Sequence, residues 1–237
     1  MVLIFRICFT IIVLTSAIYI VMEDLLNQTE KRQYSLDELL DYQKKLENSS
    51  KENSTEIIYN DSSAHALYVY IELLNKAIRD DIKQIKLFCG RFSMFRDYYE
   101  RIVESLKRTY EEQSYSSEKL EAFDPYNDLI SVLKSYLDHK DRKLDVIVVH
   151  DINDITKENC WNHLKEFFVK KQIIVSKLRY DLSLNHYMVV GDAYRRENSE
   201  DKRTALCCFN NPNTSRLLSK NFDLLLALSD KVSFEEN

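Results

Sequence analysis

The sequence predicts an α+β protein in which a long, coiled-coil-like helical body precedes a small domain of βαβββα order. Three observations lead to this prediction. The 237 residues include only two glycines and two prolines, so tight turns are scarce and long regular elements are favoured. Apolar residues recur about every 3.5 positions between residues 64 and 109, as in packed helices. After residue 143, the sequence contains short β-branched runs and runs that alternate apolar and polar residues, which are typical of strands.

The first 22 residues are largely apolar, and Arg6 is the only charged one among them. They fit a cleavable signal peptide with a small-residue site at Thr15-Ser16-Ala17. They fit equally an uncleaved anchor in which residues 2–22 span the bilayer. Both interpretations place residues 23–237 outside the cytoplasm, in a secreted or single-pass membrane protein of the secretory pathway. A buried N-terminal core helix is the remaining alternative.

Residues 23–63 are predicted to form a short helix followed by a polar linker. Ser35 and Glu38 make a capping box, which begins the helix. Sequons of the form N-x-[ST] are acceptor sites for N-glycosylation, so they support localisation in the secretory pathway. A linker rich in Asn and Ser would also contain them. The sequons begin at Asn27, Asn48, Asn53, Asn60 and Asn213.

Residues 64–142 are predicted to form the helical body or stalk. Its first helix is expected to run through Gly90, because the repeat stays in phase there and glycine inside a helix costs only about 1 kcal/mol relative to alanine. A helical hairpin that turns at Gly90 is the alternative. Asp81 is the charged exception in the repeat, and Asp124-Pro125 begins a second helix. The seam expected to drive self-association consists of Ile71, Leu74, Ile78, Ile85, Phe88, Phe92, Phe95, Tyr99, Ile102 and Leu106.

Residues 143–237 are predicted to form the α+β domain. Residues 144–149 are a β-branched run typical of a buried strand, and residues 155–170 form an amphipathic helical pattern. Residues 178–184 alternate apolar and polar side chains, which predicts a half-buried strand. Two shorter strands and a last helix complete the domain.

Candidate chemistry lies in two neighbouring segments of this domain. His150 and Asp151 follow the first predicted strand, while Cys160 and His163 lie three residues apart on the next helix. A cysteine nucleophile, a histidine base and an aspartate could together form a catalytic site. The same residues also suit loop and buried-helix positions. Neither a metal-ligand spacing nor a glycine-rich cofactor motif occurs in the sequence, so no cofactor or metal is predicted.

The four cysteines beyond residue 22 permit two disulfides or four reduced thiols. They are Cys89, Cys160, Cys207 and Cys208.

The predicted function is that of a secretory-pathway structural or interaction protein that acts by partner binding without a cofactor. The expected partner is a protein, including a second copy bound through the long helix, and the membrane if residues 2–22 remain uncleaved. A net charge of −5 without a basic face argues against nucleic acid. An enzyme with a Cys/His site in the C-terminal domain is the alternative.

Overall fold

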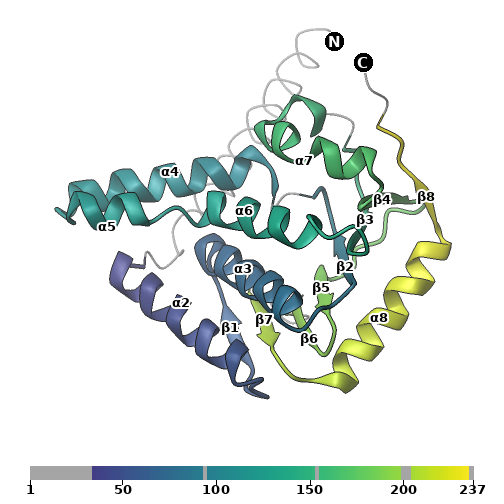
Figure 1. Ribbon diagram of the computed structural model, residues 1–237, viewed down its shortest axis with the longest axis horizontal. Coiled ribbons are helices and arrows are strands. Elements are labelled where there is room, and N and C mark those ends of the chain that lie inside the picture. Colours follow the sequence, from purple (N-terminus) through teal and green to yellow (C-terminus); the bar gives the residue numbers. More distant parts are fainter. Residues whose placement is uncertain (1–33, 93–94, 153–154, 199–203, 235–237) are drawn as a thin grey trace, which may run out of the picture. The chain divides into compact units, whose positions relative to one another are not determined.

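The computed structural model describes residues 34–92, 95–152, 155–198 and 204–234. Residues 35–237 belong to one compact unit. Within its described part, eight strands form a mixed sheet of order β1-β7-β6-β5-β2-β3-β4-β8 (Figure 1). The predicted signal or anchor segment lies outside the described residues.

Three parallel strands form the middle of this sheet. They are β2 (Gln84–Cys89), β3 (Lys143–Val148) and β4 (Ile173–Leu178). β3 is buried from its second residue onward, as expected where helices cover both faces of parallel strands. The crossover elements are α4 (Asp97–Glu112), α5 (Ser117–Ala122), α6 (Pro125–Leu137), a 3₁₀ turn (Ile155–Lys157) and α7 (Asn159–Val169).

Antiparallel strands extend the sheet on both sides. β5 (Tyr187–Val190) pairs with β2, and β8 (Ser229–Lys231) pairs with β4. Gly191, with φ +56°, stands first in the two-residue turn between β5 and β6, where a β-carbon would be strained. The strands beyond β5 are β6 (Ala193–Glu197), β7 (Ala205–Cys208) and β1 (Ile58–Asn60).

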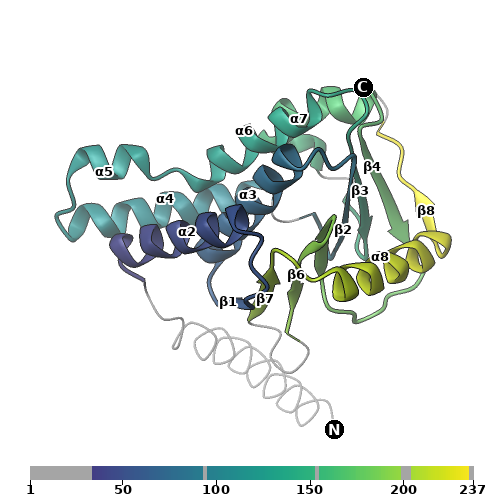
Figure 2. The ribbon, with the colours of Figure 1, turned by 60° about the horizontal axis from the view of Figure 1, so that its bottom comes forward.

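Helices cover both faces of the sheet (Figure 2). On one face, α8 (Pro212–Ala227) buries Phe222 and Leu225 against apolar residues of the central strands. On the other face lies α3 (Ser63–Arg79), with α2 (Leu36–Lys51) and α6 packed against it. α3 is buried around most of its circumference because it has the sheet on one side and helices on the others.

The predicted long helix is wrong. α3 ends at Arg79, Asp81 adopts φ +53°, and the chain then enters β2, which ends directly before Gly90. The ten seam residues are therefore divided among α3, β2, the loop that follows it and α4. The apolar repeat stayed in phase by coincidence, and its charged exception, Asp81, marks the break. The coiled-coil body and the homodimer through it are corrected accordingly.

Two predicted helix starts are confirmed. Glu38 N donates to Ser35 Oγ over 3.2 Å, and Ser35 N donates to Glu38 Oε2 over 2.9 Å. α6 begins at Pro125, with Asp124 capping its first turn. These starts were predictable because capping needs only residues within one helical turn.

The strand predicted over residues 178–184 is wrong beyond its first residue. β4 ends at Leu178, and the residues that follow include three exposed apolar side chains, Tyr180, Leu182 and Leu184. Alternation alone did not distinguish a half-buried strand from an exposed connection between β4 and β5.

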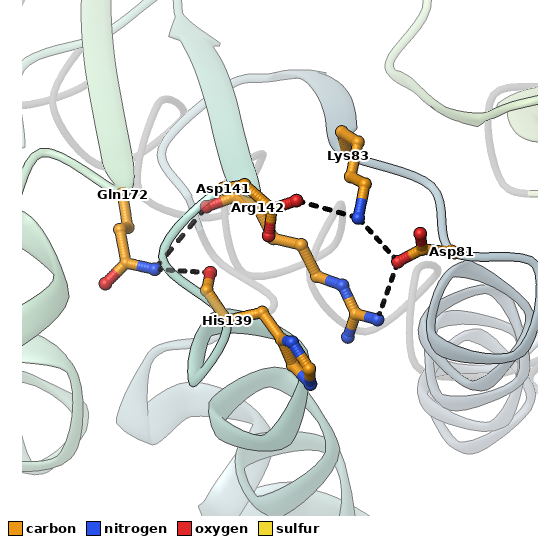
Figure 3. A network of polar contacts seen from close by, with 6 residues as sticks. All are labelled: Asp81, Lys83, His139, Asp141, Arg142 and Gln172. Carbon is orange, nitrogen blue, oxygen red and sulfur yellow. Dashed lines mark hydrogen bonds and ion pairs between the residues drawn. The ribbon is translucent and has the colours of Figure 1, made fainter.

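A polar network joins the segments that enter the three parallel strands (Figure 3): Asp81, Lys83, His139, Asp141, Arg142 and Gln172. Lys83 Nζ lies 2.7 Å from a carboxylate oxygen of Asp81 and 2.7 Å from one of Asp141. Arg142 Nη2 lies 3.1 Å from the same Asp81 oxygen. Gln172 Nε2 donates to the carbonyls of Leu137 and His139 over 2.5 and 3.0 Å. Every charged side chain in this network thus has an opposite charge beside it.

Candidate functional site

Two imidazole rings lie beside Gly90, at the carboxyl-terminal ends of β2 and β3. A β-carbon on Gly90 would lie 3.3 Å from His186 Cε1, 3.4 Å from His186 Nε2 and 3.8 Å from His150 Cδ2. His150 follows β3 and His186 precedes β5, so the fold assembles these residues from three distant segments. Because Gly90 has no side chain, its backbone lies close to both rings.

Glu197 holds His186 in one orientation. Its Oε1 lies 2.8 Å from His186 Nδ1, and its Oε2 accepts the His186 backbone N–H over 2.9 Å. Since a carboxylate can only accept, Nδ1 carries the ring proton in the neutral imidazole and Nε2 keeps its lone pair. Among the described residues, none hydrogen-bonds to that Nε2.

The charge of Glu197 suits this role. Burial raises the pKa of the Glu197 carboxyl, but hydrogen bonds from the His186 ring and backbone, with a contribution from Arg195, bring the pKa below its usual value. Glu197 is therefore ionised at neutral pH. An ionised carboxylate at Nδ1 fixes the ring tautomer and stabilises the imidazolium that forms when Nε2 accepts a proton.

Behind the histidines lies a buried group of side chains from α3, α4, β2 and β6. The Arg195 guanidinium sits 4.9 Å from the centre of the Tyr70 ring, and burial raises the pKa of the Tyr99 hydroxyl. Burial also raises the pKa of the Cys89 thiol to about 12. At neutral pH this cysteine is a thiol and not a nucleophilic thiolate.

The two helices that begin at this edge cap each other. Asp97 N donates to Glu158 Oε2 over 3.0 Å at the start of α4, and Asn159 N donates to Asp97 Oδ1 over 2.9 Å at the start of α7. Arg96 Nε pairs with Glu158 Oε1 over 2.7 Å. The N-termini, which elsewhere attract anions, are thus satisfied by carboxylates of this chain.

Of the four catalytic candidates from the sequence, His150 lies at this site. Asp151 Oδ1 is paired with Lys177 Nζ at 2.6 Å. Cys160 is buried within α7, where burial raises its pKa to about 12, while His163 is exposed on the same helix.

Sequence reasoning missed His186 and Glu197. A usable signal was present, because a two-residue turn at Gly191-Asp192 makes positions 186 and 197 cross-strand neighbours. The position of Gly90 beside them carried no comparable signal, since it depends on the pairing of β5 with β2.

The predicted glycosylation sites differ in exposure. Asn48, Asn53 and Asn213 are exposed, whereas Asn60 is 3% exposed in β1. Asn27 lies outside the described residues.

Comparisons with known proteins leave the family open. No family model and no curated protein matches the chain. Among solved structures, it is similar to TrmBL2, an archaeal chromatin protein with a novel mode of DNA binding (10% identity, TM-score 0.44, 96% of this chain, 66% of that chain). It is also similar to Nuc from Salmonella typhimurium, a phospholipase D family member (6% identity, TM-score 0.42, 76% of this chain, 97% of that one). The chain thus spans about two thirds of the chromatin protein. Likenesses this distant do not define what the present chain binds or catalyses.

These findings correct the predicted partners and the predicted localisation. The stalk of the proposed interaction protein does not exist, and in the described part of the chain no helix is long and apolar enough to cross a membrane. The four described cysteines are free thiols. The secretory, membrane-anchored glycoprotein is withdrawn, while the predicted anchor itself lies outside the described residues. The exclusion of nucleic acid is withdrawn as well, with a DNA-binding chromatin protein among the similar structures.

Proposed function

We propose that this chain is a hydrolytic enzyme in which His186, oriented by Glu197, is the catalytic base or nucleophile. The observation that carries the proposal is the two-sided environment of the His186 ring. Nδ1 lies 2.8 Å from the Glu197 carboxylate, while no described residue hydrogen-bonds to Nε2 and the side chain is 38% exposed. A carboxylate, an oriented imidazole and a ring nitrogen left for the reacting group are the elements of acid–base and nucleophilic catalysis.

The chemistry available to this arrangement is proton transfer during ester hydrolysis. As a water oxygen bonds to the electrophilic centre, Nε2 of His186 takes the water proton, and Glu197 stabilises the resulting imidazolium. The proton then passes to the leaving oxygen as its bond to that centre breaks. His150, whose ring also lies beside Gly90, is a second candidate donor of that proton. In the nucleophilic alternative, Nε2 bonds to the electrophilic centre as the bond to the leaving oxygen breaks, and water then cleaves the bond to Nε2 and frees His186.

The test compares the wild type with His186→Gln on three chromogenic esters: p-nitrophenyl acetate, p-nitrophenyl phosphate and bis(p-nitrophenyl) phosphate. We expect at least one ester to be hydrolysed, and its kcat/KM to fall by about 10²–10⁴-fold in the variant, the usual contribution of a positioned acid–base group. His163→Gln is the matched control, since this histidine is exposed on α7 and should leave the rate unchanged. Equal rates of wild type and His186→Gln on all three esters would contradict the proposal.

Gly90→Ala tests the position of the ring separately. The added methyl group would lie 3.3 Å from the His186 ring, closer than an ordinary contact, so it should displace the ring and lower kcat/KM about tenfold or more. An unchanged rate in Gly90→Ala would show that catalysis does not depend on the position of the ring beside Gly90.

A further inference from the structure

Arg195 is a buried cation without a counter-ion in the described part of the chain. The residue is only 9% exposed, and its Nε has no hydrogen-bond partner. Its guanidinium lies over the ring of Tyr70, at 4.9 Å from the ring centre. A buried guanidinium normally needs a carboxylate or another anion to offset its lost hydration, and a cation–π contact replaces only part of that.

Two other cations with little exposure do have such partners. Arg142 pairs with Asp81 at 3.1 Å and Lys86 with Asp223 at 2.6 Å. The carboxylate nearest to Arg195 along its own strand face is Glu197, which is engaged by His186. Arg195 lowers the pKa of Glu197 through space, but no described carboxylate forms an ion pair with Arg195.

The strand register places this unpaired charge next to the histidine site. Arg195 pairs across the hairpin with Met188, and Glu197 lies two residues further on the same face of β6. Successive residues on one face are about 7 Å apart, a distance that an arginine side chain can bridge. An anion bound by Arg195 would therefore carry the rest of its molecule toward His186.

The other common anion sites at this edge are occupied. The N-termini of α4 and α7 are capped by Glu158 and Asp97. These carboxylates place negative charge at both N-termini and engage one backbone donor of each, so recognition of an anion falls to a side chain.

We infer that Arg195 is the residue that binds the negatively charged group of the substrate, so that the proposed enzyme acts on an ester carrying a phosphate or carboxylate group. This inference rests on the proposed function. Arginine suits the role because its planar guanidinium presents several donors to two oxygens at once.

The test measures binding of inorganic phosphate and of acetate to the full chain by NMR titration, so that no turnover is needed. We expect phosphate, acetate or both to bind the wild type, and Arg195→Met to weaken that binding about 10- to 100-fold, as for loss of a charge-assisted hydrogen bond. Arg195→Lys should retain part of the affinity. Arg196→Gln is the matched control, because Arg196 points to the opposite face of β6, toward Tyr194, and should bind like the wild type.

A thermal measurement separates recognition from folding. Without anion, Arg195→Met should melt no lower than the wild type, because the change removes an unpaired buried charge. With phosphate or acetate, whichever binds, the melting temperature should rise for the wild type and not for Arg195→Met.

The two proposals fail in different ways. Unchanged anion affinity in Arg195→Met, or no anion binding by the wild type, would overturn the role of Arg195 and leave the His186 experiment intact. Full activity of His186→Gln combined with Arg195-dependent anion binding would instead overturn the catalytic role of His186.

Discussion

The amino-terminal and carboxyl-terminal edges of the parallel strands differ in whether a buried arginine is paired with a carboxylate. At the edge where the strands begin, Arg142 stacks 5.5 Å from the centre of the Tyr136 ring and pairs with Asp81 (Figure 3). At the edge where they end, Arg195 stacks on Tyr70 but has no described carboxylate. Both are buried arginines over a tyrosine ring, and they differ in the counter-ion. An ion-paired network stabilises a junction, whereas a buried charge without a paired carboxylate beside an oriented histidine is a feature of a binding site.

The largest expected effect is on the stability of the paired edge. Gln172→Met removes the donor that bonds the buried carbonyl of Leu137 and the partly buried carbonyl of His139. Leaving buried acceptors unsatisfied should lower the free energy of unfolding by about 2–3 kcal/mol, measured by urea denaturation. Lys170→Gln, an exposed change nearby, should stay within about 0.5 kcal/mol of the wild type. A Gln172→Met protein as stable as the wild type would show that this network does not support the junction.

The comparison between the two arginines is tested by measuring how Arg142→Met and Arg195→Met change the free energy of unfolding. Arg142→Met removes a bond to Asp81 and the packing of the arginine stem on Tyr136, so the free energy of unfolding should fall by about 1–2 kcal/mol. Arg195→Met should cause no such loss. Equal destabilisation by the two changes would mean that the two edges do not differ in how they satisfy charge.

The smallest expected effect concerns pH. The folded-state pKa of Glu197 lies below its ordinary value because of its hydrogen bonds with His186. The stability from this carboxylate is therefore present above the unfolded-state pKa of about 4.3 and is lost as pH falls through the folded-state value. Glu197→Gln should lose stability relative to the wild type near pH 6, and the difference should shrink toward pH 3. A difference that stays constant over this range, in parallel denaturation curves, would exclude a charged role for Glu197.

Each part of the site was predictable to the extent that the residues which determine it lie close together in the sequence. His150 was recognised because it follows a β-branched run that forms β3. His186 and Glu197 were within reach of the sequence, since one short hairpin pairs them. Gly90 was assigned to a helix interior, because the segment before it satisfies a helical repeat as well as a strand.

The sequence by itself determined the helix starts at Ser35 and Asp124-Pro125 and the existence of β3, because capping and β-branched runs act within a few neighbouring residues. Only the tertiary structure decided that Gln84–Cys89 is a strand. Its apolar residues suit either element, and pairing with β3 and β5, which lie more than 50 residues away in the chain, settles the choice. The same long-range pairing brings Gly90 to His150 and His186. The candidate site therefore depends on a strand assignment that the local sequence pattern does not determine.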